Sequence, residues 1–167
     1  MRKTNKITGL LYVIMLFSSC GYYAHKQKQV LVEQIRNTND SLDKMTKEWH
    51  NLLDKAVKVK NFSALNAQRI QIGQFLSRRR SVIANLELPA DAETLRGSED
   101  VYLSAQVGMV TDFYPQFELF NDLTPDSTIQ YHLRLVSKDV ETEVSWYLTI
   151  KKSLDVFVIK NGIKNTK

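Results

Sequence analysis

The chain has 167 residues, of which 43% are hydrophobic and 25% are charged, and its formal net charge is +5. This length suits one domain with a single core and is short for two. Six glycines and three prolines supply little material for the many turns of an all-β fold. We therefore expect one helical domain.

Residues 1–19 have the layout of a secretory signal peptide. A basic start is followed by an apolar run over residues 7–17 and by two serines before Cys20. A helix that spans a bilayer needs about 20 apolar residues, so this run is short for a stable anchor. We expect the segment to be removed. An ordinary signal peptide followed by an incidental cysteine, and an uncleaved membrane anchor, are the alternatives.

The sequence Phe17-Ser18-Ser19-Cys20 resembles a lipobox, the site at which lipoprotein signal peptidase cleaves before a cysteine that carries diacylglycerol. Phe17 stands where bacterial lipoproteins usually have Leu, a relaxation common among Bacteroidota-type lipoproteins. The resemblance covers residues 1–20 only. It implies a covalent diacylglycerol and an N-acyl chain such as palmitate on Cys20, with no other cofactor. The size and helical pattern of the remainder also resemble small uncharacterised helical envelope lipoproteins.

Two further observations agree with lipidation. Cys20 is the only cysteine, so no intramolecular disulfide is possible, and a lone exported thiol is otherwise unexplained. Loss of residues 1–19 would also remove Arg2, Lys3 and Lys6, leaving 20 of the 23 basic side chains against 18 acidic ones. The mature net charge is then near +2, so the high pI is no evidence for nucleic-acid binding, and we expect no nucleic-acid partner.

After the signal peptide we expect a lipidated cysteine and tether over residues 20–30, a helical bundle over 31–160 and a basic tail over 161–167. The first helix is expected from Leu31, where a heptad pattern begins. Its predicted buried seam is Leu31, Ile35, Thr38, Leu42, Met45, Trp49, Leu52, Ala56 and Val59.

The second helix is expected to start near Phe62 or Ser63, with Asn61 or Ser63 as the N-cap, and to stop near Leu86 because Pro89 follows. Its predicted stripe is Leu65, Ile72, Leu76, Ile83 and Leu86, flanked by Phe75 and Val82.

The third helix is expected after Asp91, which is a good N-cap residue. Pro115 removes a backbone hydrogen bond, so we predict a kink or break near residues 112–115, with helix resuming through Phe120. The predicted inward residues are Leu95, Tyr102, Met109 and Phe113.

The fourth helix has the clearest start, because Thr124 can cap it and Pro125 suits the first helical position. Gly162 lies just past its expected end. Its predicted seam is Ile129, Leu133, Val136, Val140, Val144, Tyr147, Lys151, Leu154 and Val158. Four amphipathic helices with short connections predict an all-α, up-down-up-down four-helix bundle. Residues 139–150 also have enough strand-forming residues to leave an α+β fold as the minority alternative.

Few residues point to catalysis. His25, His50 and His132 lie on different segments without the spacing of a zinc site, and we expect surface histidines and no metal. Neither a glycine-rich phosphate loop nor a Gly-x-Ser-x-Gly nucleophile motif is present. The sequence therefore favours a protein that is not an enzyme, with no catalytic residue assigned.

Two clusters suggest binding instead. Arg78, Arg79 and Arg80 occupy consecutive helical positions, so one should point along the seam while the others face water. In the assumed bundle they lie toward the membrane, where we expect either a solvated face or contact with anionic lipid.

The second cluster is aromatic and surrounds the predicted kink. We expect Phe113, Tyr114, Phe117 and Phe120 to form either core packing at the distal end of the bundle or a patch for an envelope protein partner.

The leading functional hypothesis is a non-enzymatic, lipid-anchored cell-envelope protein that acts as a structural or adaptor subunit. An accessory lipoprotein of an envelope-spanning secretion or transport complex, and a bundle that binds a small apolar ligand, are the alternatives. Surface-exported Bacteroidota-type lipoproteins resemble one another in acidic residues soon after the cysteine, which are missing from residues 21–26. We therefore expect an outer-membrane lipoprotein facing the periplasm, with the inner membrane and the cell surface as alternatives.

Overall fold

The computed structural model describes residues 5–164, and it describes side chains from Gly21 onward except that of Asp139. The acylation expected at Cys20 and the tail residues 165–167 lie outside the residues so described. The elements in chain order are α1 (Asn5–Val59), α2 (Leu65–Ala84), the 3-10 turn η1 (Ala90–Ala92), α3 (Glu93–Gly108), the π-helical turn η2 (Met109–Phe113), α4 (Tyr114–Glu118) and α5 (Asp126–Lys160).

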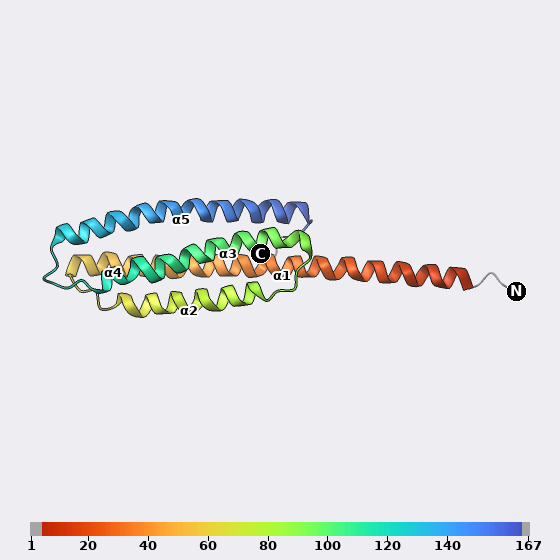
Figure 1. Ribbon diagram of the computed structural model, residues 1–167, viewed down its shortest axis with the longest axis horizontal. Coiled ribbons are helices and arrows are strands. Elements are labelled where there is room, and N and C mark those ends of the chain that lie inside the picture. Colours follow the sequence, from red (N-terminus) through yellow and green to blue (C-terminus); the bar gives the residue numbers. More distant parts are fainter. Residues whose placement is uncertain (1–4, 165–167) are drawn as a thin grey trace.

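The described residues form an all-α bundle, as expected. Adjacent helices run in opposite directions, with α3, η2 and α4 together making the third member, so the topology is up-down-up-down (Figure 1). Residues 139–150 are helical and the described residues contain no strand, so the α+β alternative is wrong.

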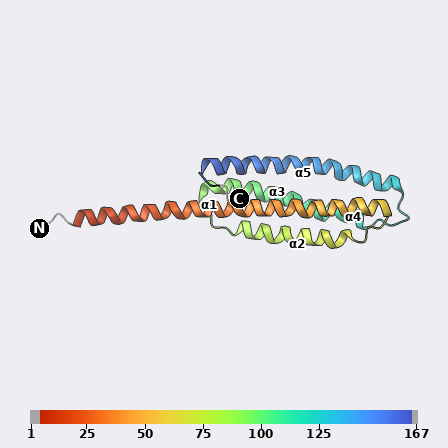
Figure 2. The ribbon, with the colours of Figure 1, turned by 180° about the vertical axis from the view of Figure 1, so that it is seen from behind.

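The two ends of the bundle differ. At one end α1 projects well beyond the other helices and α5 finishes; we call this the anchor end (Figures 1 and 2). At the other, the distal end, the connections over residues 60–64 and 119–125 lie close together.

Helix α1 continues through the segment expected to be a tether. Residues 21–30 are helical and belong to the same unbroken helix as the heptad seam. Most of that seam is buried as predicted, with Leu31 and Trp49 fully enclosed. Val59 is an exception, since it is 71% exposed at the last turn. The helix ends there because Lys60 takes a left-handed conformation with φ of 52°.

Helix α2 starts later than predicted, and neither Asn61 nor Ser63 caps it. The N-cap position is Ala64, without a side-chain hydrogen bond. Asn61 instead accepts hydrogen bonds from the backbone N–H and the hydroxyl of Ser63, which satisfies the connecting turn and not the helix. The predicted stripe is correct for Leu65, Ile72, Leu76 and Ile83, which are all buried.

Asp91 is also not the N-cap that the sequence suggested. It lies inside η1, and the N-cap of α3 is Ala92, again without a side-chain hydrogen bond. The carboxylate of Asp91 turns toward Lys28 of α1. An ion pair between helices has therefore replaced the local cap.

The predicted interruption before Pro115 is confirmed as a π-helical turn. The backbone N–H of Tyr114 donates to the carbonyl of Met109, five residues back. The widened turn accommodates a proline that has no N–H to donate and whose ring would clash with the preceding turn. Helix resumes only to Glu118, two residues short of Phe120.

Helix α5 begins at Asp126 and ends at Lys160, close to the predicted limits. Pro125 is its N-cap, while the hydroxyl of Thr124 accepts from the N–H of Asn121, so Thr124 is not the cap. Gly162 has φ of 61° just past the end, as its position suggested.

The seam of α5 was misassigned in its middle. Val144 is 50% exposed and Lys151 is exposed, whereas Ile150 is buried and Glu143 is partly buried. The core face follows Val140, Glu143, Tyr147, Ile150, Leu154 and Phe157.

Candidate functional site

Polar side chains interrupt the core over about two helical turns, and we call this set the polar layer. Its members come from all four long helices: Thr38 and Asn39 of α1, Arg79 of α2, Glu99 and Gln106 of α3, and Glu143 of α5. Thr38, Asn39, Glu99 and Gln106 are at most 7% exposed. Buried polar groups cost free energy unless they are paired, so their positions are a strong constraint on how the helices align.

Glu99 is the most unusual member of the polar layer. Its side chain is completely buried and accepts one hydrogen bond, at 3.3 Å, from the amide of Asn39. Burial raises the pKa of Glu99 to about 7, and this shift is opposed by the Asn39 hydrogen bond and by the charge of Arg79. The second carboxyl oxygen of Glu99 and the amide oxygen of Asn39 have no partner among the described residues. A proton on this carboxyl would supply a donor where acceptors predominate.

Glu143 brings a second carboxyl to the layer. Burial raises the pKa of Glu143, and the neighbouring amide of Gln106 opposes the shift. The pKa of the buried Tyr102 is raised first by burial and then by the charges of Glu143 and Glu99. Because burial disfavours the charged form and the negative charges would repel one another, the neutral forms of the two acids and the phenol are all favoured.

Arg79 joins the polar layer to solvent. Its guanidinium donates to the hydroxyl of Thr38 at 2.8 Å and to the side-chain oxygen of Gln34 at 2.5 Å. It also donates to the backbone carbonyl of Gln34 at 3.3 Å. Among the three consecutive arginines, Arg79 is therefore the one that points along the seam, as the helical spacing required.

The other two arginines face outward. Arg80 pairs with Asp100 of α3 at 3.0 Å, while Arg78 is exposed and bonds the carbonyl of Gln74 in its own helix. Arg79 and Arg80 are thus engaged within the bundle. Lipid contact by these two side chains would require breaking those bonds, so Arg78 is the member best placed for it.

We predict that Arg79→Met lowers the free energy of unfolding by about 2 kcal/mol, because it leaves Thr38 and Gln34 without the donor that satisfies them. Arg78→Met is the matched control, and it should change stability by less than about 0.5 kcal/mol. Urea denaturation of both variants measures the difference. If both variants lose the same free energy of unfolding, the hydrogen bonds of Arg79 add nothing to stability beyond its charge.

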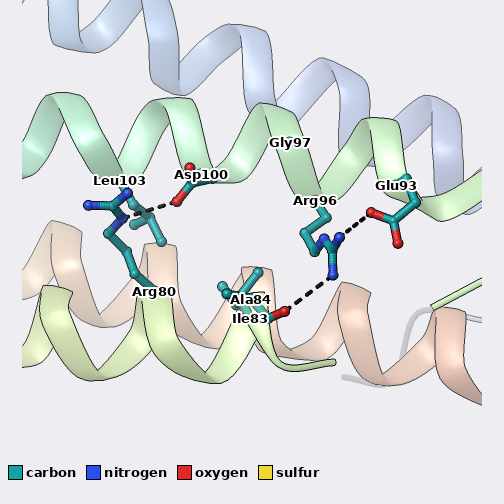
Figure 3. A pocket seen from close by; sticks show the side chains of 8 residues that line it. All are labelled: Arg80, Ile83, Ala84, Glu93, Arg96, Gly97, Asp100 and Leu103. Atoms are coloured by element: carbon teal, nitrogen blue, oxygen red, sulfur yellow. Dashed lines mark hydrogen bonds and ion pairs between the residues drawn. The ribbon is translucent and has the colours of Figure 1, made fainter. Parts of the chain in front are cut away.

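A groove of about 430 Å³ lies beside Arg80, between α2 and α3 (Figure 3). Arg80 reaches across it to Asp100, and Arg96 pairs with Glu93 and donates to the carbonyl of Ala84. Each arginine in the groove is matched by an acid. The bonds of Arg80 and Arg96 across the groove therefore link α2 to α3, and the groove offers no unpaired charge to a ligand.

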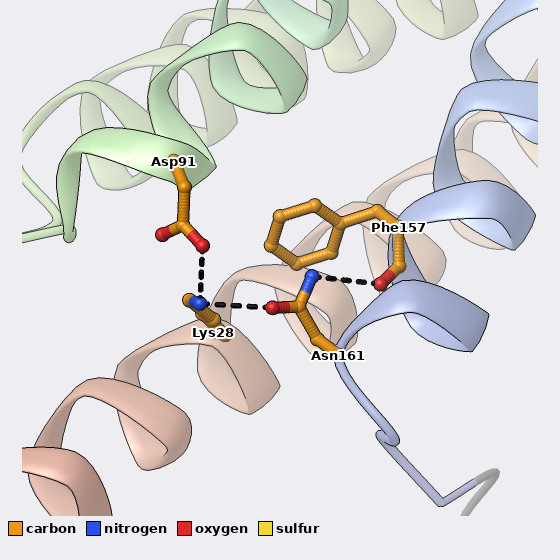
Figure 4. Close-up of polar contacts among 4 residues, drawn as sticks. All are labelled: Lys28, Asp91, Phe157 and Asn161. Atoms are coloured by element: carbon orange, nitrogen blue, oxygen red, sulfur yellow. Dashed lines mark hydrogen bonds and ion pairs between the residues drawn. The ribbon is translucent and has the colours of Figure 1, made fainter.

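The anchor end is held by Lys28 of α1 (Figure 4). Its ammonium group lies 2.5 Å from a carboxylate oxygen of Asp91 and 2.8 Å from the side-chain oxygen of Asn161. Asn161 in turn donates to the carbonyl of Phe157. The Lys28 hydrogen bond lowers the pKa of Asp91. One side chain thus connects the helix that projects from the bundle to η1, just before α3, and to the residue that follows α5.

The distal aromatic cluster is largely core. Tyr114 and Phe117 are completely buried, and Tyr114 stacks on Trp49 with ring centroids 3.7 Å apart. Phe113 and Phe120 are only partly buried. Of the two expectations, core packing is correct for Tyr114 and Phe117, whose rings lie against Trp49 of α1, and the partner-binding patch is wrong for these two residues.

The histidines are less exposed than expected. His50 is partly buried against Trp49, and burial lowers its pKa while Asp54 opposes the shift. His132 packs on Phe120 with ring centroids 5.2 Å apart. Among the described residues, no cluster of His, Cys, Asp and Glu is suited to hold a metal ion.

Searches of family models, curated sequences and solved structures found no match to this chain. Within the described part of the chain, every helix lacks an apolar stretch sufficient to cross a bilayer.

Proposed function

We propose that the chain is a non-enzymatic, lipid-anchored protein of the cell envelope, whose bundle acts as a structural or adaptor subunit. The single observation that carries this proposal is the continuity of α1. Residues 21–30, which would follow the acylated Cys20, are helical and run directly into the buried seam. An anchor at Cys20 would therefore be attached to the core of the bundle by a helix and not by a loose tether.

The remaining architecture supports a structural role. Hydrogen bonds within the polar layer join α1 to α3 and to α2. The arginines of the groove beside Arg80 are each matched by an acid. Five pockets of about 190 to 510 Å³ are lined by residues of neighbouring elements of the bundle. An accessory subunit of a secretion or transport complex would need a docking surface other than Tyr114 and Phe117.

The anchor is tested by Cys20→Ala. We expect the unaltered protein to be processed in a globomycin-sensitive manner and to fractionate with membranes, and the variant to keep its leader or to lose membrane association after ordinary cleavage. Ser19→Ala is the matched control, since it leaves the cysteine in place. Mass spectrometry of the N-terminal peptide reads out the acyl chains directly. Globomycin-insensitive processing with an unmodified Cys20 would contradict the proposal.

For location we propose the periplasmic face of the outer membrane, on the basis that residues 21–26 carry no acid. Separation of inner and outer membranes, followed by protease treatment of intact cells, distinguishes this location from the inner membrane and from the cell surface.

A further inference from the structure

The last turns of α5 carry an outward face that combines apolar and basic side chains. We call it the α5 terminal surface: Lys152, Val156, Ile159 and Lys160. Ile159 is 81% exposed and Val156 is 57% exposed. The spacing of residues 152, 156 and 159 places them on one side of the helix, opposite the buried Leu154 and Phe157.

The adjoining surface extends this pattern. A pocket of about 420 Å³ lies between α3 and α5, and its lining includes Lys152 and Lys160 together with Leu95 and Phe157. Asp91 also lines the pocket, but its charge is paired with Lys28. Asp155, next to Val156 in sequence, is an exposed acid, so Lys152 and Lys160 stand against one unpaired carboxylate. The local balance is therefore basic around an apolar floor.

The position of this surface in the molecule indicates what it faces. Cys20 precedes Lys28 by eight residues in a continuous helix, which is about 12 Å along the axis. Lys28 bonds Asn161, which directly follows α5. Tyr22 and Tyr23 are exposed on the projecting part of α1, and tyrosine favours the level of the lipid headgroups. A headgroup layer is about 6 Å deep, so the bundle must tilt about its anchor for the outward face of α5 to reach that layer.

We propose that the α5 terminal surface docks onto an anionic lipid bilayer, with Ile159 and Val156 against the headgroup region and the lysines beside lipid phosphates. This inference rests on the proposed anchor at Cys20, because the anchor places this end of the bundle at the membrane. It moves the lipid contact from the arginines, two of which are paired within the bundle, to exposed lysines of α5.

The test uses the full protein isolated from membranes and reconstituted into vesicles of phosphatidylcholine, with or without phosphatidylglycerol. A nitroxide label is attached at Ile159→Cys or, as the control, at Leu123→Cys, which is 84% exposed at the distal end. We expect the label at 159 to lose accessibility to a water-soluble nickel chelate on anionic vesicles only. The label at 123 should remain accessible on both.

Charge is tested separately with Lys152→Gln/Lys160→Gln in the labelled Ile159→Cys protein. We expect the ratio of docked to undocked protein to fall by about 30-fold, whereas Lys55→Gln/Lys58→Gln, which removes equal charge from the far part of α1, should leave it unchanged. Equal nickel accessibility at 159 and 123 on anionic vesicles would overturn the docking. So would protection of 159 on neutral vesicles or in detergent, which indicates contact with a second protein chain.

The two proposals fail in different ways. A protein that carries acyl chains on Cys20 but leaves the label at 159 in water overturns the docking alone. A protein without acyl chains on Cys20 overturns the anchor, and the docking with it. Mass spectrometry of the same sample decides between these outcomes.

Discussion

Replacing Glu99 with glutamine should raise the free energy of unfolding by about 3 kcal/mol at pH 8 and leave it nearly unchanged at pH 4. Burial raises the pKa of Glu99 to about 7 in the folded chain, against its ordinary value of 4.5. For a raised pKa, the protonated group stabilises the fold fully below about pH 4.5. That contribution is lost as the pH rises toward 7, at about 1.4 kcal/mol for each pKa unit. Glutamine stays neutral throughout and keeps the shape of the acid.

The measurement is urea denaturation of both proteins across this pH range. Glu141→Gln is the control, because Glu141 lies exposed on α5, and its substitution should change stability by less than about 0.5 kcal/mol. Because Glu143 also titrates from a raised pKa, the difference between the two proteins at each pH is the quantity to compare. A Glu99→Gln variant that is no more stable at pH 8 would mean that Arg79 and Asn39 fully compensate the buried charge.

The second large effect on stability is expected from the loss of the buried tryptophan, Trp49. Trp49→Ala should lower the free energy of unfolding by about 3–5 kcal/mol, because Trp49 is completely buried and stacks on Tyr114 with the ring planes 7° apart. Such a loss is a large share of the stability of a single domain. Guanidinium denaturation followed by circular dichroism measures it.

Trp146 provides the matched control, since it is the second tryptophan of the chain and is 43% exposed. Trp146→Ala should cost less than about 1 kcal/mol. If Trp49→Ala fails to fold, Trp49→Phe keeps an aromatic ring and should show a smaller loss. Comparable losses for the two alanine variants would place the aromatic core elsewhere.

The sequence predicted the fold class well because the spacing of apolar residues indicates a helix even where a cap or a single seam residue is misassigned. The order, direction and approximate limits of the four long helices follow from heptad spacing and from Pro115, Pro125 and Gly162. The N-caps were less predictable. Asn61 and Asp91 have the right chemistry for capping, but the tertiary fold used Asn61 for a turn and Asp91 for a partner on α1.

The sequence placed Thr38 in the buried seam and one arginine along it, but the Glu and Gln members of the polar layer were missed for one physical reason. Positions 99 and 106 continue the spacing of Leu95, Tyr102 and Met109, and position 143 continues that of Val140 and Tyr147. Because these positions hold Glu and Gln, a rule that assigns apolar residues to the core passes over them. In α5 the same rule moved the seam onto Val144. Interruptions of a seam by acids or amides were the signal that could have revealed the polar layer.

Lys28 lies on the same helix as the proposed anchor, and α1 runs the whole length of the bundle. A pulling force applied at Cys20 would therefore load the interfaces of α1 in shear along their full length, instead of peeling one contact at a time. Many contacts must then yield together before the helix slides. By this geometry the chain resists mechanical extraction from its own bundle most strongly along the direction in which a membrane would pull it.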